Sequence, residues 1–232
     1  MAVRLTTTRD AAQLNGLKIC VYGQAGAGKT RLAATAEEPT IIISAEAGLL
    51  SLRDLDIPVI EVDSIEDVHE AYTFIANSDE AKHFRWVCLD SVSEIAEVVL
   101  GVEKAATKDP RHAYGALAER MGELLRAFRD LPGRNVYMSA KLERQKDDLT
   151  GAMLYTPAMP GQRLGQALPY LFDEVFAMRV EKDPDGNPTR WLQTGADLQY
   201  SAKDRSGALD MFEPPSLAAI ARKILQPTDR KD

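Results

Sequence analysis

The sequence has few of the features that mark secreted or membrane-spanning proteins. It contains only two cysteines, Cys20 and Cys88, and both lie inside apolar runs, so we expect buried free thiols and no disulfide. No run of 18 or more apolar residues is present, and residues 1–16 contain no apolar signal core. These absences predict a cytoplasmic protein that does not cross a membrane.

Basic residues are also in deficit. The chain has 28 Lys and Arg against 35 Asp and Glu, which gives a formal net charge of −7. This balance argues against nucleic-acid binding through the overall field of the protein, although a narrow basic groove or loop is compatible with it. Any nucleic-acid site therefore has to be argued from local residues.

Short apolar runs alternate with helical patterns along the first 140 of the 232 residues. We expect strands at 17–22, 40–44, 57–62, 84–90 and 135–140, and helices at 29–38, 65–77, 92–102 and 114–131. Such alternation predicts βαβ units, and therefore an α/β protein with a mostly parallel central sheet between two layers of helices.

The second part of the chain has a weaker pattern. Residues 142–163 are polar, carry Gly and Pro, and show no sustained period, so we expect a flexible loop there. Two strand-like runs, 173–181 and 189–194, flank a turn-rich linker and predict an antiparallel hairpin added at the sheet edge. We expect a single domain over 1–232, with an extension at 1–16 and a polar tail at 226–232.

The segment after the first strand, GQAGAGKT, fits the phosphate-loop pattern G-x-x-x-x-G-K-[ST] in its strand–loop–helix context. Its glycines allow a tight turn that directs backbone N–H groups at phosphate oxygens. Lys29 can reach the β- and γ-phosphates, and the Thr30 hydroxyl can bind Mg²⁺. The residues expected to hold the nucleotide are Gly23, Gln24, Ala25, Gly26, Ala27, Gly28, Lys29, Thr30 and Arg31.

Asp90 ends the apolar run FRWVCLD, where a carboxylate would meet Mg²⁺ through water. The alternative is a polar strand end or a helix cap.

The next residue is Ser91, although many additional-strand ATPases, including AAA-type motors, carry a catalytic glutamate at that position. The base that activates water would then have to come from elsewhere or be absent. Glu46 follows the isoleucine-rich run TIIIS at 40–44. Strand ends of a parallel sheet open into the ligand crevice, so the Glu46 carboxylate could lie there and activate the attacking water. A solvated strand end is the alternative for Glu46.

The positions of Glu46 and of Leu89-Asp90-Ser91 resemble those of the RecA-like recombinases. This resemblance implies a three-layer RecA-like core that binds ATP and Mg²⁺ and assembles into homo-oligomers, rings or filaments, with ATP at the subunit interface. It also implies that Lys203 and Arg205, in SAKDRSG, reach the ATP of a neighbouring subunit, although an ordinary charged loop is the alternative. Lys141 would sense the γ-phosphate, at a position where glutamine is usual in the family.

Further stretches resemble the short, phage-encoded, Sak-type single-strand annealing proteins, over about residues 17–217. They are SAEAGLLSL, LDSVSE, YGALAERMGELLRAFRDLPGRNV, MPGQRLGQALPYLFDEV and KDRSG. This resemblance implies an ATPase of phage-type homologous recombination that binds and anneals single-stranded DNA in the cytoplasm of a bacterial host. A single-strand-binding protein would be a further partner.

DNA-binding loops of RecA-like proteins would fall here in 103–115 and 142–163. Basic residues near aromatic ones suit a strand whose phosphates are neutralised while its bases stack. Acidic residues are interleaved with them, so solvated surface loops are the alternative. The candidates are Lys104, Lys108, Arg111, Tyr114, Arg144, Lys146 and Arg163.

Two other functions stay open at this point. One is a RecA-fold ATPase that acts as a loader or regulator on protein partners. The other is a nucleotide or small-molecule kinase, with 142–163 as its lid.

Overall fold

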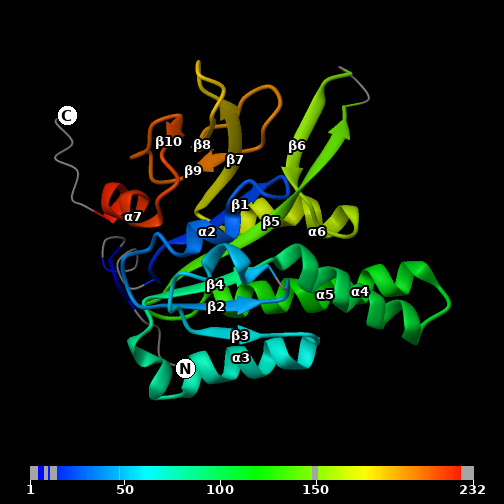
Figure 1. The fold of residues 1–232 in the computed structure, drawn as a ribbon. Coiled ribbons are helices and arrows are strands. Elements are labelled where there is room, and N and C mark those ends of the chain that lie inside the picture. Colours follow the sequence, from blue (N-terminus) through cyan, green and yellow to red (C-terminus); the bar gives the residue numbers. More distant parts are fainter. Residues whose placement is uncertain (1–4, 8–9, 11–14, 47, 148–150, 226–232) are drawn as a thin grey trace.

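The computed structural model describes residues 5–7, 10, 15–46, 48–147 and 151–225. Most of the expected extension at 1–16, the tail at 226–232 and three residues of the stretch 142–163 lie outside the described residues. The described chain forms a ten-stranded sheet with helices on both faces (Figure 1).

The strands are β1 (Lys18–Gly23), β2 (Thr40–Ser44), β3 (Val59–Glu61), β4 (Trp86–Asp90), β5 (Asn135–Lys146), β6 (Met153–Pro157), β7 (Glu174–Lys182), β8 (Pro188–Gln193), β9 (Lys203–Asp204) and β10 (Phe212–Glu213). The α-helices are α2 (Lys29–Ala33), α3 (Ile65–Asn77), α4 (Val92–Ala106), α5 (Pro110–Arg129), α6 (Gln162–Ala167) and α7 (Leu217–Leu225). Three short 3-10 helices complete the set: η1 (Leu49–Leu52), η2 (Glu80–His83) and η3 (Leu168–Leu171).

The strand order is β10-β8-β7-β1-β5-β4-β2-β3, with β6 paired to β5 and β9 to β7. The neighbours from β7 to β3 run parallel, whereas β8 and β10 are antiparallel additions. Strand β5 lies between β1 and β4. The expected α/β class with a mostly parallel sheet and antiparallel C-terminal strands is confirmed. One detail differs, because β7 pairs in parallel with β1 and only β8 and β10 extend the sheet.

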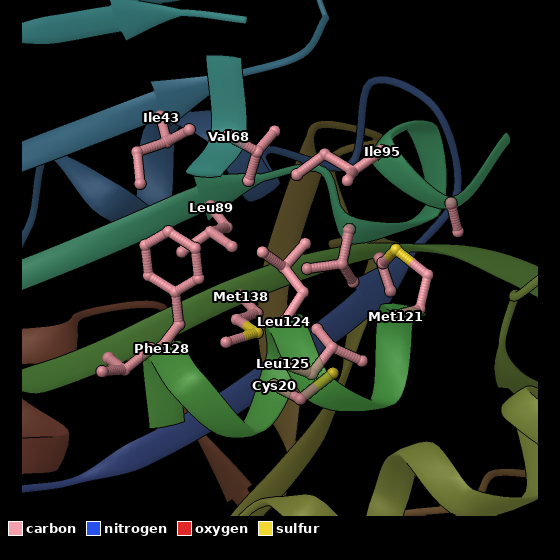
Figure 2. Packing of buried hydrophobic residues seen from close by; sticks show 14 of the residues in the cluster. Cys20, Ile43, Val68, Leu89, Ile95, Met121, Leu124, Leu125, Phe128 and Met138 are labelled. Carbon is pink, nitrogen blue, oxygen red and sulfur yellow. The ribbon is translucent and has the colours of Figure 1, made fainter. Parts of the chain in front are cut away.

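The central strands are buried on both faces, so alternate side chains enter two separate cores. Cys20 faces the core under α3, α4 and α5, while Ile19 and Val21 face the core under α2 and α7. Figure 2 shows the first core, in which Leu124 and Phe128 of α5 pack toward the sheet. Both cysteines are buried free thiols, as expected, and they lie in different cores. None of the helices in the described residues is long and apolar enough to cross a membrane.

Helix α2 is shorter than expected, because it ends at Ala33 and not at residue 38. The chain turns at Glu37, whose φ of 58° is left-handed, and Pro39 follows. A left-handed residue cannot continue a right-handed helix, and proline disfavours helical backbone in the residue before it.

The expectation of a DNA-binding loop over 103–115 and of a flexible loop over 142–163 is wrong for most of the described residues. Helix α4 continues to Ala106, and α5 begins at Pro110 with Asp109 as its N-cap, so the first connection spans only 107–109. In the second stretch β5 continues to Lys146 and pairs with β6 as an antiparallel ribbon. Figure 1 shows this ribbon projecting beyond the helical layers. Most of its residues keep solvent contact, so the sequence shows no apolar alternation there.

The carboxyl group of Glu174, at the start of β7, is buried with only 1% of the residue exposed. Its partner across the antiparallel pair is Asp204 of β9, and the Ser206 N–H donates to its Oε1 at 3.3 Å. Burial, followed by the charge of Asp204, raises the pKa of Glu174 from 4.5 to about 8. The folded chain therefore holds this proton at neutral pH.

This buried carboxyl predicts a pH-dependent loss of stability. The unfolded chain releases the proton near pH 4.5 and the folded chain only near pH 8, so the free energy of unfolding falls as pH rises between these values. We expect Glu174→Gln to flatten that fall in urea unfolding measured from pH 5 to pH 8. Glu119→Gln, an exposed control on α5, should leave it as in the wild type. An unchanged fall in Glu174→Gln would contradict the assignment.

Candidate active site at the phosphate loop

The phosphate loop leaves the carboxyl end of β1 and turns into α2. Gly26 has φ 73° and Gly28 has φ 108°, a left-handed region that glycine tolerates best. Gly23 is required for a different reason, because a Cβ atom there would lie 3.1 Å from the Met178 carbonyl oxygen on β7. The loop geometry thus depends on all three glycines.

Lys29 lies against its own loop. Its Nζ donates to the carbonyl oxygens of Gly23 and Gln24, each at 3.0 Å. Burial lowers the pKa of Lys29, and the charges of Asp90 and Glu46 act in the opposite direction. The lysine and the two carboxylates therefore share one electrostatic site.

Asp90, the last residue of β4, is connected to α2 and to β5 through its carboxylate. The Thr30 hydroxyl donates to Oδ2 at 2.5 Å, and the Ser139 hydroxyl on β5 donates to Oδ1. The residue is buried, and the peptide bond that follows it is cis.

Hard oxygen donors of this kind suit Mg²⁺, which is commonly held by one or two protein groups together with water and phosphate. Thr30 and Asp90 fit that role. The described residues contain no cluster of three or more His, Cys, Asp or Glu that would form a metal cage of protein ligands alone.

Glu46 lies at the end of the neighbouring strand, as predicted. Ser44 pairs with Asp90 in the β2–β4 register, and the Ala45 N–H donates to the Asp90 carbonyl at 2.9 Å. The Ser91 hydroxyl donates to Oε1 of Glu46 at 2.5 Å. Ser91 therefore helps to orient the carboxylate of Glu46, which stays the candidate base.

Lys141 lies in the middle of β5 and contacts two carboxylates of α4. Its Nζ contacts Glu94 at 2.5 Å and Glu97 at 3.2 Å. Burial alone would lower the pKa of Lys141, but the hydrogen bonds to Glu94 and Glu97 outweigh it and the pKa lies above its ordinary value. The positive charge of Lys141 also acts to lower the pKa of Lys29.

Lys203 and Arg205 lie away from the phosphate loop of their own chain. Lys203 pairs with Val175, which pairs with Cys20 near the start of β1, whereas the loop follows the end of β1. The Lys203 Nζ donates to the carbonyl oxygens of Pro169 at 2.7 Å and Phe172 at 2.5 Å. The exposed Arg205 pairs with Asp173 at 2.7 Å.

Three of the candidate DNA-binding residues meet on one surface, although they come from α4, α5 and α6. The Lys104 Nζ lies 5.4 Å from the ring centroid of Tyr114, and Tyr114 and Arg163 line one cavity of about 290 Å³. We call Lys104, Tyr114 and Arg163 the α4–α6 surface.

The interleaved acidic residues of this region have structural roles. Glu103 is buried and pairs with Arg120 at 3.0 Å, while Asp109 caps α5. The remaining candidates lie elsewhere. Lys108 and Arg111 are exposed at the α4–α5 connection, and Arg144 and Lys146 are exposed on the β5–β6 ribbon, with Arg144 5.6 Å from the Tyr155 ring.

Sequence reasoning missed three residues that contact this site. Tyr137 donates from its hydroxyl to the Lys29 carbonyl at 2.8 Å, and Ser139 donates to Asp90. The polar atoms of these two residues, inside the apolar run NVYMSA, were an available signal. Arg190 of β8 donates from Nε to the Ala27 carbonyl at 3.0 Å, and no pattern in the sequence pointed to it.

The chain is similar to a known protein family and to solved structures. A protein family described as an AAA domain matches residues 15–206 of the chain. The solved structure of a KaiC-like protein from the archaeon Pyrococcus horikoshii is similar over 76% of this chain and 78% of that chain, with 15% sequence identity and a TM-score of 0.43. No protein with a curated description matches the sequence.

The Asp90 geometry predicts a specific loss in Asp90→Asn. The amide keeps the size of the carboxylate but removes its charge, so we expect the Mg²⁺-dependent part of ATP affinity to fall at least tenfold. ATP binding should be measured by calorimetry with Mg²⁺ and with EDTA. Asp210→Asn, at an exposed carboxylate, is the control. Equal Mg²⁺ dependence in Asp90→Asn and wild type would show that Asp90 does not hold the ion.

Proposed function

This chain belongs to the AAA domain family, and from that premise we propose that it binds ATP with Mg²⁺ at the phosphate loop and hydrolyses it. The observation that carries the proposal is that three charged residues lie at the carboxyl edge of the sheet: Lys29 at the start of α2, and Asp90 and Glu46 at the ends of the neighbouring strands β4 and β2. Ligands bind at this edge in open parallel sheets.

Each of these residues has a distinct task in the proposed reaction. Lys29 neutralises charge on the β- and γ-phosphates, and Asp90 with Thr30 would hold Mg²⁺. An Mg²⁺ ion held by Thr30 and Asp90 would supply positive charge that stabilises the negative charge developing on the phosphates. Glu46 accepts a proton from the attacking water. The oxygen of that water bonds to the γ-phosphorus while the bond from the γ-phosphorus to the β–γ bridging oxygen breaks, and ADP leaves. Ser91 keeps the carboxylate of Glu46 turned toward the site.

Glu46→Gln should separate binding from hydrolysis. Glutamine can keep the Ser91 hydrogen bond but cannot accept the proton, so we expect ATP affinity to stay near wild type while turnover falls by about 10²-fold or more. Turnover should be measured by phosphate release, and affinity by calorimetry. Glu61→Gln, at the exposed end of the neighbouring strand β3, is the matched control. Unchanged turnover in Glu46→Gln would remove the role that we give this residue.

We further propose that the partner of this ATPase is single-stranded DNA, and that the protein anneals complementary strands as Sak-type proteins do. Support comes from the α4–α6 surface, where Lys104 lies near the ring of Tyr114 and Arg163 lines the same cavity as that ring. Base stacking on an aromatic ring together with phosphate neutralisation suits a single strand without sequence preference. Because Glu103 and Asp109 have structural partners, the acidic residues oppose such binding less than the sequence suggested.

Homo-oligomers, rings or filaments, complete this proposal. With few phosphate contacts per subunit, affinity would come from linked subunits that bind one strand together. Arg205 is exposed and is our candidate for the cation that reaches the ATP of a neighbouring subunit, while Lys203 supports its turn through two carbonyl contacts. A single-strand-binding protein would be a further partner.

A DNA-stimulated ATPase is the expected signature. We expect single-stranded DNA to increase phosphate release, and Lys104→Ala/Arg163→Ala to weaken DNA binding and to reduce the slope of log affinity against log salt by about 1.4, or about 0.7 for each lost phosphate contact. Binding should be measured by fluorescence anisotropy across salt concentrations. Arg53→Ala/Lys82→Ala removes two exposed cations elsewhere and is the control. ATPase activity that does not change when single-stranded DNA is added would favour the alternative function, an ATPase that acts as a loader or regulator on protein partners.

A further inference from the structure

Arg190 contacts the phosphate loop although it lies on the antiparallel hairpin, outside the parallel strands that form the phosphate site. Its Nε donates to the Ala27 carbonyl at 3.0 Å. Within the described residues its two terminal nitrogens, Nη1 and Nη2, make no hydrogen bond. The side chain therefore contacts the phosphate loop through one of its five N–H groups and keeps the other four for another partner.

The side chain of Arg190 lies close to the backbone of the loop. A Cβ atom at Gly28 would lie 3.4 Å from both Cδ and Nε of Arg190, and 3.7 Å from the Met178 sulfur. The absence of a side chain at Gly28 thus lets Arg190 and Met178 approach the loop from the side of β7 and β8.

Arg190 lines a pocket of about 360 Å³ beside the phosphate loop, on the face of the sheet that α2 and α7 cover. Buried Leu32 and Met178 form apolar parts of its wall. The pocket has no carboxylate among its lining residues, and a second arginine, Arg31, is tied to the Ser51 carbonyl at 3.0 Å. The full lining is Gly26, Gly28, Arg31, Leu32, Thr35, Ser51, Met178, Arg190 and Pro215.

The chemistry of this pocket suits the nucleoside end of a nucleotide. A flat, uncharged ring gains from apolar walls, and a planar guanidinium stacks on such a ring. The volume lies in the range of small-molecule sites. In a nucleotide the ribose and the base are attached to the phosphates, so they lie beside the loop when the phosphates occupy it. This pocket adjoins the loop at Gly26 and Gly28.

We propose that this pocket holds the base and ribose of the bound nucleotide, and that Arg190 sets affinity for them by covering the base. The inference rests on the proposed function, because it needs a nucleotide whose phosphates occupy the loop. It adds a residue of the C-terminal hairpin to a site that is otherwise built from β1, β2, β4 and β5.

Comparison of ATP with inorganic tripolyphosphate, which carries the phosphates and lacks the nucleoside, tests the proposal. We expect Arg190→Ala to weaken ATP binding about tenfold, the scale of one lost stacking contact of a guanidinium, and to leave tripolyphosphate binding unchanged. Arg190→Lys should be nearly as weak for ATP, because it keeps the charge and loses the planar group. Both ligands should be measured by calorimetry with Mg²⁺ on the full chain, with circular dichroism as a check of folding.

Two controls separate this proposal from the proposed function. Lys182→Ala removes an exposed cation of the same hairpin and should bind both ligands as the wild type does. Lys29→Ala should lose both ligands, and if it lost neither, the phosphate site itself would be misassigned. Equal weakening of ATP and tripolyphosphate in Arg190→Ala would reduce Arg190 to a support of the loop, and unchanged ATP affinity would also overturn the proposal.

Discussion

The carboxylate of Asp90 is the point on which the site depends. Its two oxygens accept hydrogen bonds from Thr30, at the start of α2, and from Ser139 on β5. A buried carboxylate is stable only when its oxygens are satisfied, so these contacts bind the phosphate loop, β4 and β5 into one arrangement. Because β5 lies between β1 and β4, neither hydroxyl could meet Asp90 if the strand order were different.

The β2–β4 register then places the second carboxylate. Pairing of Ser44 with Asp90 places Glu46 two residues beyond the end of β2, where the Ser91 hydroxyl donates to its carboxylate. A shift of one residue in this parallel pair would turn the isoleucines of β2 toward the opposite cores. The apolar packing on both faces of the sheet therefore also decides where the candidate base lies.

Prediction from sequence succeeded where burial and local chemistry agree. The strand at 40–44 and the helix at 65–77 were predicted with their observed bounds, since the strand is buried on both faces and Ser64 caps the helix in a capping box. It failed along the β5–β6 ribbon, where hydrogen bonds between exposed strands leave no apolar period. It failed also at the end of α2, where the backbone of Glu37 turns against the helical pattern.

The phosphate loop, the parallel α/β class and the candidate carboxylates could be predicted from the sequence, because each depends on local spacing or on the end of an apolar run. Which distant side chains contact the loop depends on how the chain folds. Tyr137, Ser139 and Arg190 reach it across the strand order β8-β7-β1-β5, and strand order is a long-range property that no local pattern carries. For the same reason Lys104 and Arg163, far apart in the chain, share a surface with Tyr114 only after α4, α5 and α6 have packed.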